Sequence, residues 1–215
     1  MRPVALLWAV WVLGDTVGRA MRNPVRLKNF GRRYLPWYAL GLAVLALSQP
    51  THAAFWVGFA LVFVGGALRS WGAGHLLKND ELIVSGPYSR VRHPLYAGTL
   101  LVGLGFGTIA GGWLTLAILP VLAIWFFASY FPRKERAESS RLAEIYGDGF
   151  AAYRDAVPAL FPTLAAWRPP HGIVGLGDPE LRWSFQRYSE NNELGTLLAL
   201  LAGLLAFGAR TLVGA

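Results

Sequence analysis

The chain has 215 residues, of which 54% are hydrophobic and only 15% are charged, whereas about 25% of the residues of an ordinary soluble domain are charged. Long apolar runs alternate with short basic clusters, which is typical of a helical membrane protein and excludes a disordered chain or a large extramembrane domain. There is no cysteine, so disulfides, thiolate nucleophiles and cysteine-based metal sites are excluded.

The apolar runs predict a polytopic, all-α transmembrane bundle. A spanning helix takes about 20 residues, so the chain has room for five to six spans. They are expected at about 3–20, 34–47, 53–77, 95–110, 113–131 and 194–212. We therefore divide the chain into N-terminal transmembrane helices (1–79), a central part (80–162), and a linker with a C-terminal transmembrane helix (163–215).

The positive charges indicate how the bundle is oriented. The segments 19–33, 78–92 and 133–154 are basic, whereas the turns 48–52 and 111–112 carry no Asp, Glu, Lys or Arg. By the positive-inside rule we expect the basic segments to face the cytoplasm. The expected location is the inner membrane of a bacterium. The net charge of +8 thus indicates topology and contact with anionic membrane lipids, and no nucleic-acid partner is expected.

The segment 133–155 predicts an amphipathic helix that lies on the membrane surface. Its apolar residues recur at helical spacing on one face, and its charged residues fall largely on the other. A break in this helix is expected near Gly147. The apolar face consists of Leu142, Ile145, Tyr146, Phe150 and Tyr153.

The stretch 82–98 carries the densest set of polar and special residues. Gly86-Pro87 predicts a turn, and Pro94 predicts the first turn of a helix. Polar side chains therefore gather at the cytoplasmic mouth of the bundle beside a helix N-terminus, which suits a carboxylate or a phosphate. Taken singly, such residues also serve as anchors at a membrane interface. The polar side chains are Tyr88, Arg92, His93 and Tyr96.

Two signatures in this region resemble a known family. Gly86-Pro87-Tyr88, followed by Arg92-His93-Pro94-x-Tyr96-x-Gly98, resembles the signature of the isoprenylcysteine carboxyl methyltransferase family, which is similar here to membrane phospholipid N-methyltransferases. The second signature follows after a helical hairpin and comprises Glu138, Leu142, Tyr146-Gly147, Phe150, Tyr153, Val157-Pro158 and Pro162. The resemblance covers about 80–162, whereas 1–79 match only in their pattern of spans and 163–215 do not match.

The resemblance implies S-adenosyl-L-methionine as the methyl donor, bound in a cytoplasmic pocket under the charged segment 133–155. The acceptor would be lipophilic, either an isoprenylcysteine-like carboxylate or a phospholipid amine. The implied cofactor-binding residues are Asp80, Glu81, Leu82, Ile83, Tyr88, His93, Pro94, Leu95, Tyr96, Gly98 and Glu138. The implied catalytic residues on the acceptor side are Lys134, Arg133 and Arg92.

The chemistry of these residue types agrees with the implied roles. A carboxylate such as Glu138 can accept hydrogen bonds from a ribose or an ammonium group, and tyrosine rings attract a sulfonium cation. One departure stands out, because the family has a second glutamate where this chain has Ser139. Glu135 lies one helical turn earlier and could compensate only partly, and Glu138 keeps its spacing to the second signature.

Two other functions fit parts of the pattern. Membrane sterol reductases, which use NADPH, are similar in their C-terminal halves but are much longer. In a non-catalytic membrane protein, the arginine, histidine and glutamate side chains would serve only packing and topology. The glycines of the run 98–107, among them Gly98, are explained first by close packing of transmembrane helices.

Overall fold

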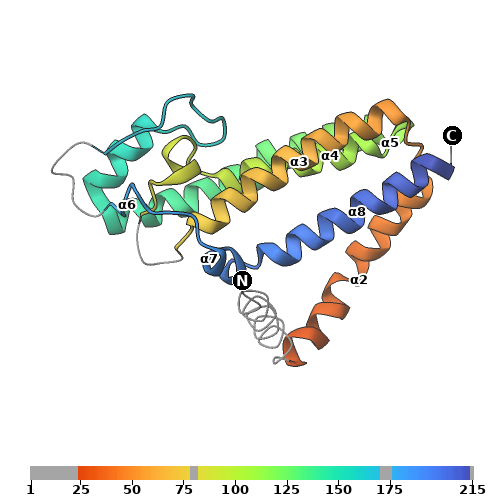
Figure 1. Cartoon of the computed structure of the whole chain (residues 1–215), viewed down its shortest axis with the longest axis horizontal. Coiled ribbons are helices and arrows are strands. Elements are labelled where there is room, and N and C mark those ends of the chain that lie inside the picture. The colour runs from red at the N-terminus through yellow and green to blue at the C-terminus, as the bar shows by residue number, and fades with distance from the viewer. Residues whose placement is uncertain (1–23, 78–81, 170–175, 214–215) are drawn as a thin grey trace, which may run out of the picture. The chain divides into compact units, whose positions relative to one another are not determined.

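The computed structural model describes residues 24–77, 82–169 and 176–213. The chain divides into two units, residues 1–46 and 47–215, and each is described by itself. The first unit contains nearly all of helix α2 (Pro24–Leu47) (Figure 1). This helix begins ten residues before the predicted start at residue 34, because proline is favoured at a first helical position and Arg and Lys are good helix formers. The span expected at 3–20 lies outside the described residues.

The second unit is helical, as predicted. Among its described residues the only β pairing is an isolated bridge between Leu82 and Leu176. The helices in chain order are α3 (His52–His75), the 3₁₀ turn η1 (Gly86–Ser89), α4 (Pro94–Ile109), α5 (Gly112–Trp125), the π-helical turn η2 (Phe126–Tyr130), α6 (Phe131–Ala156), α7 (Phe185–Glu190) and α8 (Glu193–Val213).

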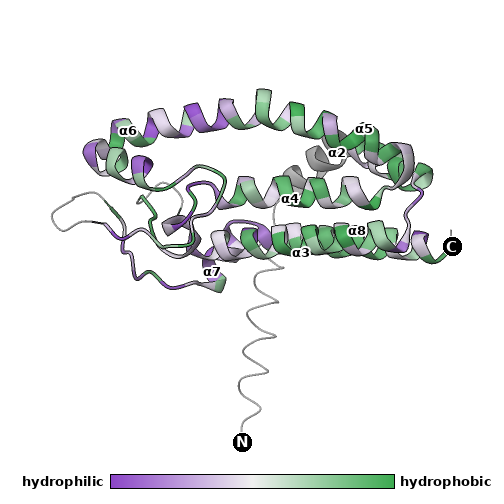
Figure 2. Ribbon diagram, turned by 90° about the horizontal axis from the view of Figure 1, so that it is seen from above, coloured by the Kyte–Doolittle hydropathy of each residue, from purple (hydrophilic) through white to green (hydrophobic). Residues whose placement is uncertain are grey.

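Three of the described helices are long and apolar enough to cross a membrane: α3, α8 and the continuous rod formed by α5, η2 and α6. Shorter apolar helices cover 35–47 and α4. In Figure 2, hydrophobic colouring covers most of α5 and α8, whereas much of α6 is hydrophilic. Large apolar side chains such as Leu116 and Val121 are exposed, as expected for helices that face lipid.

Helices α3 and α4 pack unusually closely through two pairs of glycines. A Cβ atom added to Gly98 would lie 2.6 Å from the carbonyl oxygen of Gly65, and one added to Gly105 would lie 2.6 Å from that of Gly58. No side chain fits at such separations, so both pairs are packing residues of the kind that membrane helices use. This contact fixes where α4 begins relative to the end of α3.

The two ends of this unit differ in charge, and within the unit the connections group as predicted, whereas the basic segment 19–33 belongs to the first unit. The backbone N–H of Gln49 donates to the carbonyl of Ala110 at 2.8 Å, which joins the two uncharged turns at one end. At the other end, the N–H of Arg92 donates to the carbonyl of Pro158 at 2.8 Å. The basic loop before α4 therefore lies against the segment that follows α6.

The hydrogen-bond pattern and the charge of the rod both change where α5 ends and α6 begins. The π-helical turn Phe126–Tyr130 ends two residues before Pro132, which has no N–H to donate and displaces the regular helical ladder. Beyond it the rod is charged. The predicted break at Gly147 is confirmed, because this residue has φ 49° and ψ −123°, a conformation that glycine adopts readily. The chain after Gly147 can therefore fold back toward the start of α4.

Candidate functional site

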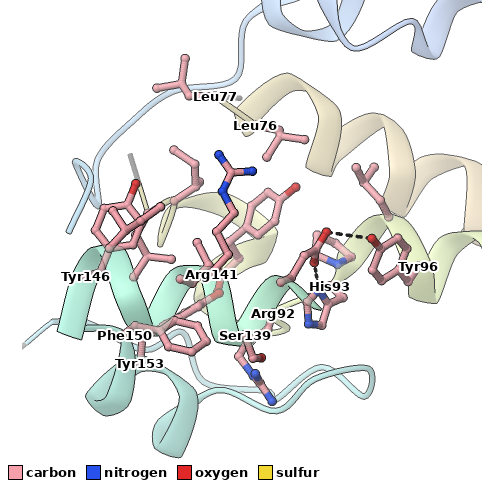
Figure 3. A pocket seen from close by; sticks show the side chains of 18 residues that line it. Leu76, Leu77, Arg92, His93, Tyr96, Ser139, Arg141, Tyr146, Phe150 and Tyr153 are labelled. Carbon is pink, nitrogen blue, oxygen red and sulfur yellow. Dashed lines mark hydrogen bonds and ion pairs between the residues drawn. The ribbon is translucent and has the colours of Figure 1, made fainter. Parts of the chain in front are cut away.

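A cavity of about 340 Å³ lies where α3 ends, α4 begins and α6 crosses over them (Figure 3). Its size falls within the range of small-molecule pockets. One part of the wall is apolar and aromatic, and another part carries polar and charged groups. The lining residues are Leu76, Leu77, Leu82, Ile83, Tyr88, Arg92, His93, Pro94, Leu95, Tyr96, Glu138, Ser139, Arg141, Leu142, Ile145, Tyr146, Phe150 and Tyr153.

The last turns of α6 form one wall of the cavity by packing on the segment before η1. Phe150 and Tyr153 are 2% exposed and belong to one buried cluster with Leu82 and Val84. The Tyr153 hydroxyl donates to the carbonyl of Tyr88 at 2.8 Å. Because these residues follow the break at Gly147, the change in helix direction is what brings the second signature onto the first.

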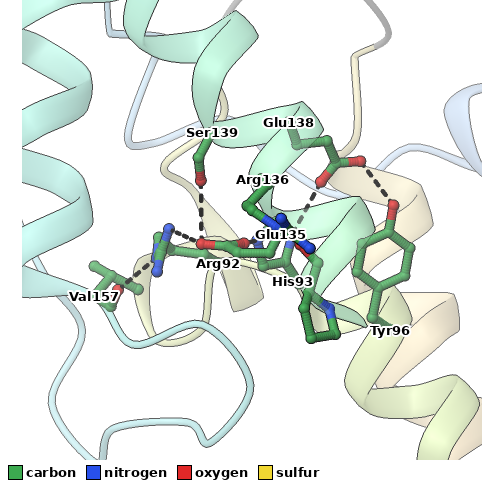
Figure 4. A network of polar contacts seen from close by, with 9 residues as sticks. Arg92, His93, Tyr96, Glu135, Arg136, Glu138, Ser139 and Val157 are labelled. Carbon is green, nitrogen blue, oxygen red and sulfur yellow. Dashed lines mark hydrogen bonds and ion pairs between the residues drawn. The ribbon is translucent and has the colours of Figure 1, made fainter. Parts of the chain in front are cut away.

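A network of four charged side chains, three of which line the cavity, forms and supports its polar wall (Figure 4). Arg92 and His93, which immediately precede α4, both form ion pairs with Glu135 on α6, and the Arg92–Glu135 distance is 2.7 Å. The other imidazole nitrogen of His93, Nδ1, lies 3.1 Å from Glu138 Oε2. Ser139 donates to Glu135 at 3.1 Å. The network therefore connects the start of α4 to α6 through both signatures.

The contacts of His93 determine its protonation. Both ring nitrogens face carboxylates, and an ionised carboxylate only accepts hydrogen bonds, so the two contacts favour the doubly protonated imidazolium. Burial opposes this charge, but the hydrogen bonds to Glu135 and Glu138 outweigh it and raise the pKa of His93. Burial opposes the charge of Glu135 as well, yet His93 and Arg92 lower the pKa of Glu135 to about 2. These contacts therefore favour the cationic form of His93 and the anionic form of Glu135.

Glu138 is the carboxylate that borders the cavity. Its side chain is 46% exposed, and Tyr96 donates to its Oε1 at 2.8 Å. Burial alone would raise the pKa of Glu138, but the hydrogen bonds from His93 and Tyr96 lower it. A fixed, ionised carboxylate beside aromatic rings can accept hydrogen bonds from hydroxyl or ammonium groups and can attract a cation.

Most residues expected at the cofactor do line this one cavity. They are Leu82, Ile83, Tyr88, His93, Pro94, Leu95, Tyr96 and Glu138, together with Arg92 from the acceptor side. Gly98 instead faces α3, against Gly65 and Arg69. Asp80 and Glu81 lie outside the described residues. Lys134 and Arg133 are exposed and are not among the residues that line the cavity.

The structure adds two residues that the sequence interpretation did not assign to the site. Glu135 connects Arg92 to His93, and its position one helical turn before Ser139 was the signal that pointed to it. Arg141 lines the cavity, and Figure 3 shows its side chain extending from α6 toward the end of α3. Nothing in the sequence distinguishes Arg141 from the other charged residues of its helix.

A comparison with known proteins places the charged network inside a family match. The chain matches the family described as phospholipid methyltransferase over residues 39–149, a range that includes the four charged residues of the network. The chain is also 40% identical over 114 residues to the cobalt-zinc-cadmium resistance protein CzcN of Cupriavidus metallidurans. The aligned stretch covers 52% of this chain and 49% of that protein.

Two further relatives match a larger share of the chain. The nickel-cobalt-cadmium resistance protein NccN of Alcaligenes xylosoxydans xylosoxydans is 34% identical over 69% of this chain and 74% of its own length. The protein-S-isoprenylcysteine O-methyltransferase of Schizosaccharomyces pombe is 30% identical over 67% of this chain and 56% of its own. The chain thus spans about half the length of the latter and of CzcN. No solved structure matches the chain significantly.

Proposed function

The chain belongs to the phospholipid methyltransferase family, and we propose that it is an integral membrane methyltransferase that uses S-adenosyl-L-methionine and acts on a lipophilic acceptor. The observation that carries this proposal is the convergence of both signatures on one cavity. Residues from the start of α4 and from α6, which are far apart in the sequence, meet there around the ionised carboxylate of Glu138.

The donor set of the cavity fits this cofactor. Glu138 suits the ribose hydroxyls or the ammonium group, and the rings of Tyr88 and Tyr96 suit the sulfonium. The buried Leu82 and Ile83 offer an apolar edge for the adenine. When bound, S-adenosyl-L-methionine would supply a methyl group on a positively charged sulfur. An incoming nucleophile would attack the methyl carbon in line with the carbon–sulfur bond, and S-adenosylhomocysteine would be the leaving group.

The role of the protein in such a reaction is to position groups and exclude water. Tyr96 and His93 hold the Glu138 carboxylate in one orientation. Holding the reactants in a productive geometry contributes as much as about 7–11 kcal/mol to catalysis. The side chains of Phe150 and Tyr153 close the inner wall and keep water from the reacting groups.

We propose that the acceptor occupies the apolar part of the cavity, next to Leu76, Leu77, Leu142 and Ile145. Ile145 is 56% exposed, so an apolar chain that arrives from the bilayer meets an apolar edge. A carboxylate acceptor is favoured over an amine. Its oxygen is already a nucleophile, whereas the lowered pKa of Glu138 makes this residue a poor general base for an amine.

The orientation proposed from the basic segments places this cavity on the cytoplasmic side of a bacterial inner membrane. The cavity lies at the end where the basic loop before α4 meets the segment after α6. Charged S-adenosyl-L-methionine would then reach it from the cytoplasm without crossing the bilayer. Lys134 and Arg133 follow the apolar part of the rod and stay predictions for contact with the acceptor or with lipid headgroups.

Calorimetric titration of the purified full-length protein in detergent tests the proposal. S-Adenosylhomocysteine, the product form of the cofactor, should bind, and NADPH should not. Binding of NADPH alone would favour a reductase, and binding of neither would favour a non-catalytic membrane protein. A matched pair of variants, Glu138→Gln at the cavity and Glu144→Gln on the exposed side of the same helix, shows whether the titration reports this cavity.

A further inference from the structure

A buried ion pair joins α3 to α8 beside the cavity. Arg69 on α3 and Glu193 at the start of α8 bond through two atoms each, and the Nε–Oε2 distance is 3.2 Å. Their side chains are 18% and 7% exposed. Removing one partner from a buried pair leaves an uncompensated charge, which is strongly unfavourable. Ionisable residues in apolar helices commonly serve a functional site.

Arg69 also holds the first turn of α4. Its Nη1 donates to the carbonyl of Leu95 at 3.3 Å and to the hydroxyl of Thr99. The stem of Arg69 lies where a side chain at position 98 would be, because a Cβ atom on Gly98 would come within 2.5 Å of Arg69 Cγ. Leu95 lines the cavity, so Arg69 contacts the backbone of a cavity residue without lining the cavity itself.

Glu193 belongs to a segment that lies beyond the family match, yet this segment contacts the site at several points. Asn191, which directly follows α7, donates from Nδ2 to the carbonyl of the cavity residue Leu76 at 3.0 Å. The N–H of Gly177 donates to the carbonyl of Leu82 at 2.9 Å. The same end of the cavity is therefore supported by residues on both sides of α7.

We propose that Arg69 and Glu193 are positioning residues of the cofactor cavity, which makes the C-terminal segment an integral part of the methyltransferase unit. The inference rests on the proposed function. Glu193 fixes the guanidinium of Arg69, and Arg69 in turn fixes the rotation of α4. That rotation decides whether His93 and Tyr96 meet Glu135 and Glu138, because both residues stand on the first turn of α4 or directly before it.

The test is the affinity of full-length protein for S-adenosylhomocysteine, measured by calorimetry well below the unfolding temperature. Glu193→Gln should raise the dissociation constant at least about fivefold, and Glu193→Asp, which keeps the charge, should raise it less. Thr211→Val is the matched control, because Thr211 is a buried polar residue at the far end of α8. It should lower the unfolding temperature without changing the dissociation constant.

The double variant Arg69→Gln/Glu193→Gln separates positioning from stability. It removes both buried charges and should recover much of the thermal stability while the affinity stays reduced. Recovery of both together would overturn the proposal, as would unchanged affinity in Glu193→Gln. If Glu193→Gln fails to fold, Thr99→Val tests the same contact with the ion pair intact and should raise the dissociation constant about twofold or more. A wild-type protein that binds no S-adenosylhomocysteine would overturn the proposed function as well.

Discussion

His93 and Glu135, 42 residues apart in the chain, form an ion pair that joins the start of α4 to α6. The histidine precedes Pro94, which starts α4, and the glutamate lies one turn into α6. Since the second nitrogen of the same imidazole faces Glu138, the protonation of one ring holds two carboxylates in place. The geometry of the cavity wall is therefore linked to pH.

The first prediction concerns this pH dependence. The pKa of His93 is raised above 6.5, so its contribution to stability is fully present below about pH 6.5 and is lost as the pH rises through the folded-state pKa. The lowered pKa of Glu135 acts in the opposite sense, and its contribution is lost as the pH falls from 4.5 toward 2. Thermal unfolding between pH 5 and 9 should show a loss of stability at high pH that is weaker in His93→Gln. Parallel pH profiles for the two proteins would refute the link.

The second prediction concerns Glu138. Glu138→Gln removes the charge at the cavity but keeps a hydrogen-bonding side chain, so the protein should fold while its affinity for S-adenosylhomocysteine falls at least about tenfold, equivalent to about 1.4 kcal/mol. Glu144→Gln on the exposed side of α6 should bind like the wild type. Calorimetry measures both. An affinity within about threefold of the wild type in Glu138→Gln would remove Glu138 from the cofactor contacts.

The third prediction tests whether Glu135 replaces the glutamate that the related family has at position 139. Glu135→Ala leaves Arg92 and His93 without their shared carboxylate, so both stability and cofactor affinity should fall. Because the Ser139 hydroxyl lies 3.1 Å from Glu135 Oε1, a glutamate at position 139 would reach the same two cations.

The double variant Glu135→Ala/Ser139→Glu should therefore recover a large part of both losses. Thermal unfolding and calorimetric titration of the two variants and the wild type measure the recovery. The single variant Ser139→Glu serves as the control, because it places a third carboxylate in the network and should not improve on the wild type. A double variant no better than Glu135→Ala would show that the two positions are not equivalent.

Much of the architecture could be predicted because apolar run length and proline or glycine positions act locally. The start of α4 at Pro94 and the break at Gly147 follow from backbone preferences of single residues. Arg69 and Glu193 show what a single sequence does not reveal. They are separated by 124 residues, and periodicity says which face of a helix is polar but not which distant helix will meet it.

In the site, too, some residues could be predicted from local sequence patterns, whereas others depend on tertiary packing. The two signatures indicated Glu138 and His93 because their spacing is distinctive. Glu135 is indicated only by its position one helical turn before Ser139, and Arg141 stands on a charged helix among many similar residues. Whether such a side chain faces solvent or a cavity depends on how α6 turns at Gly147 and packs on Leu82. That packing is a tertiary effect, which residue spacing alone does not determine.

The fourth prediction concerns the contact of α3 with α4. Gly98→Ala adds a Cβ atom 2.6 Å from the carbonyl of Gly65 and 2.5 Å from Arg69 Cγ. The two helices must separate, which should destabilise the protein by about 1–3 kcal/mol. Gly195→Ala on α8 is the control, because its added Cβ meets nothing within 4 Å. Chemical denaturation in detergent compares the two variants, and equal stabilities would contradict the tight contact.

The last prediction concerns the positive charge that meets the acceptor. Sequence resemblance pointed to Lys134, which does not line the cavity. Arg141, which is exposed like Lys134, does line the cavity and extends across it (Figure 3). A guanidinium there can orient a carboxylate through two parallel hydrogen bonds. With N-acetyl-S-farnesylcysteine as the acceptor probe, Arg141→Gln should raise KM or lower kcat about tenfold and leave the affinity for S-adenosylhomocysteine nearly unchanged.

Lys134→Gln supplies the comparison, since both variants remove one positive charge from α6. If the acceptor binds at the cavity charge, Arg141→Gln will slow methyl transfer to the probe and Lys134→Gln will hardly change it. The reverse order would return the acceptor contact to Lys134. Equal and small effects that vanish at high salt would instead assign both charges to the membrane surface, because attraction between exposed charges and anionic lipid is screened within about 10 Å at 0.1 M salt.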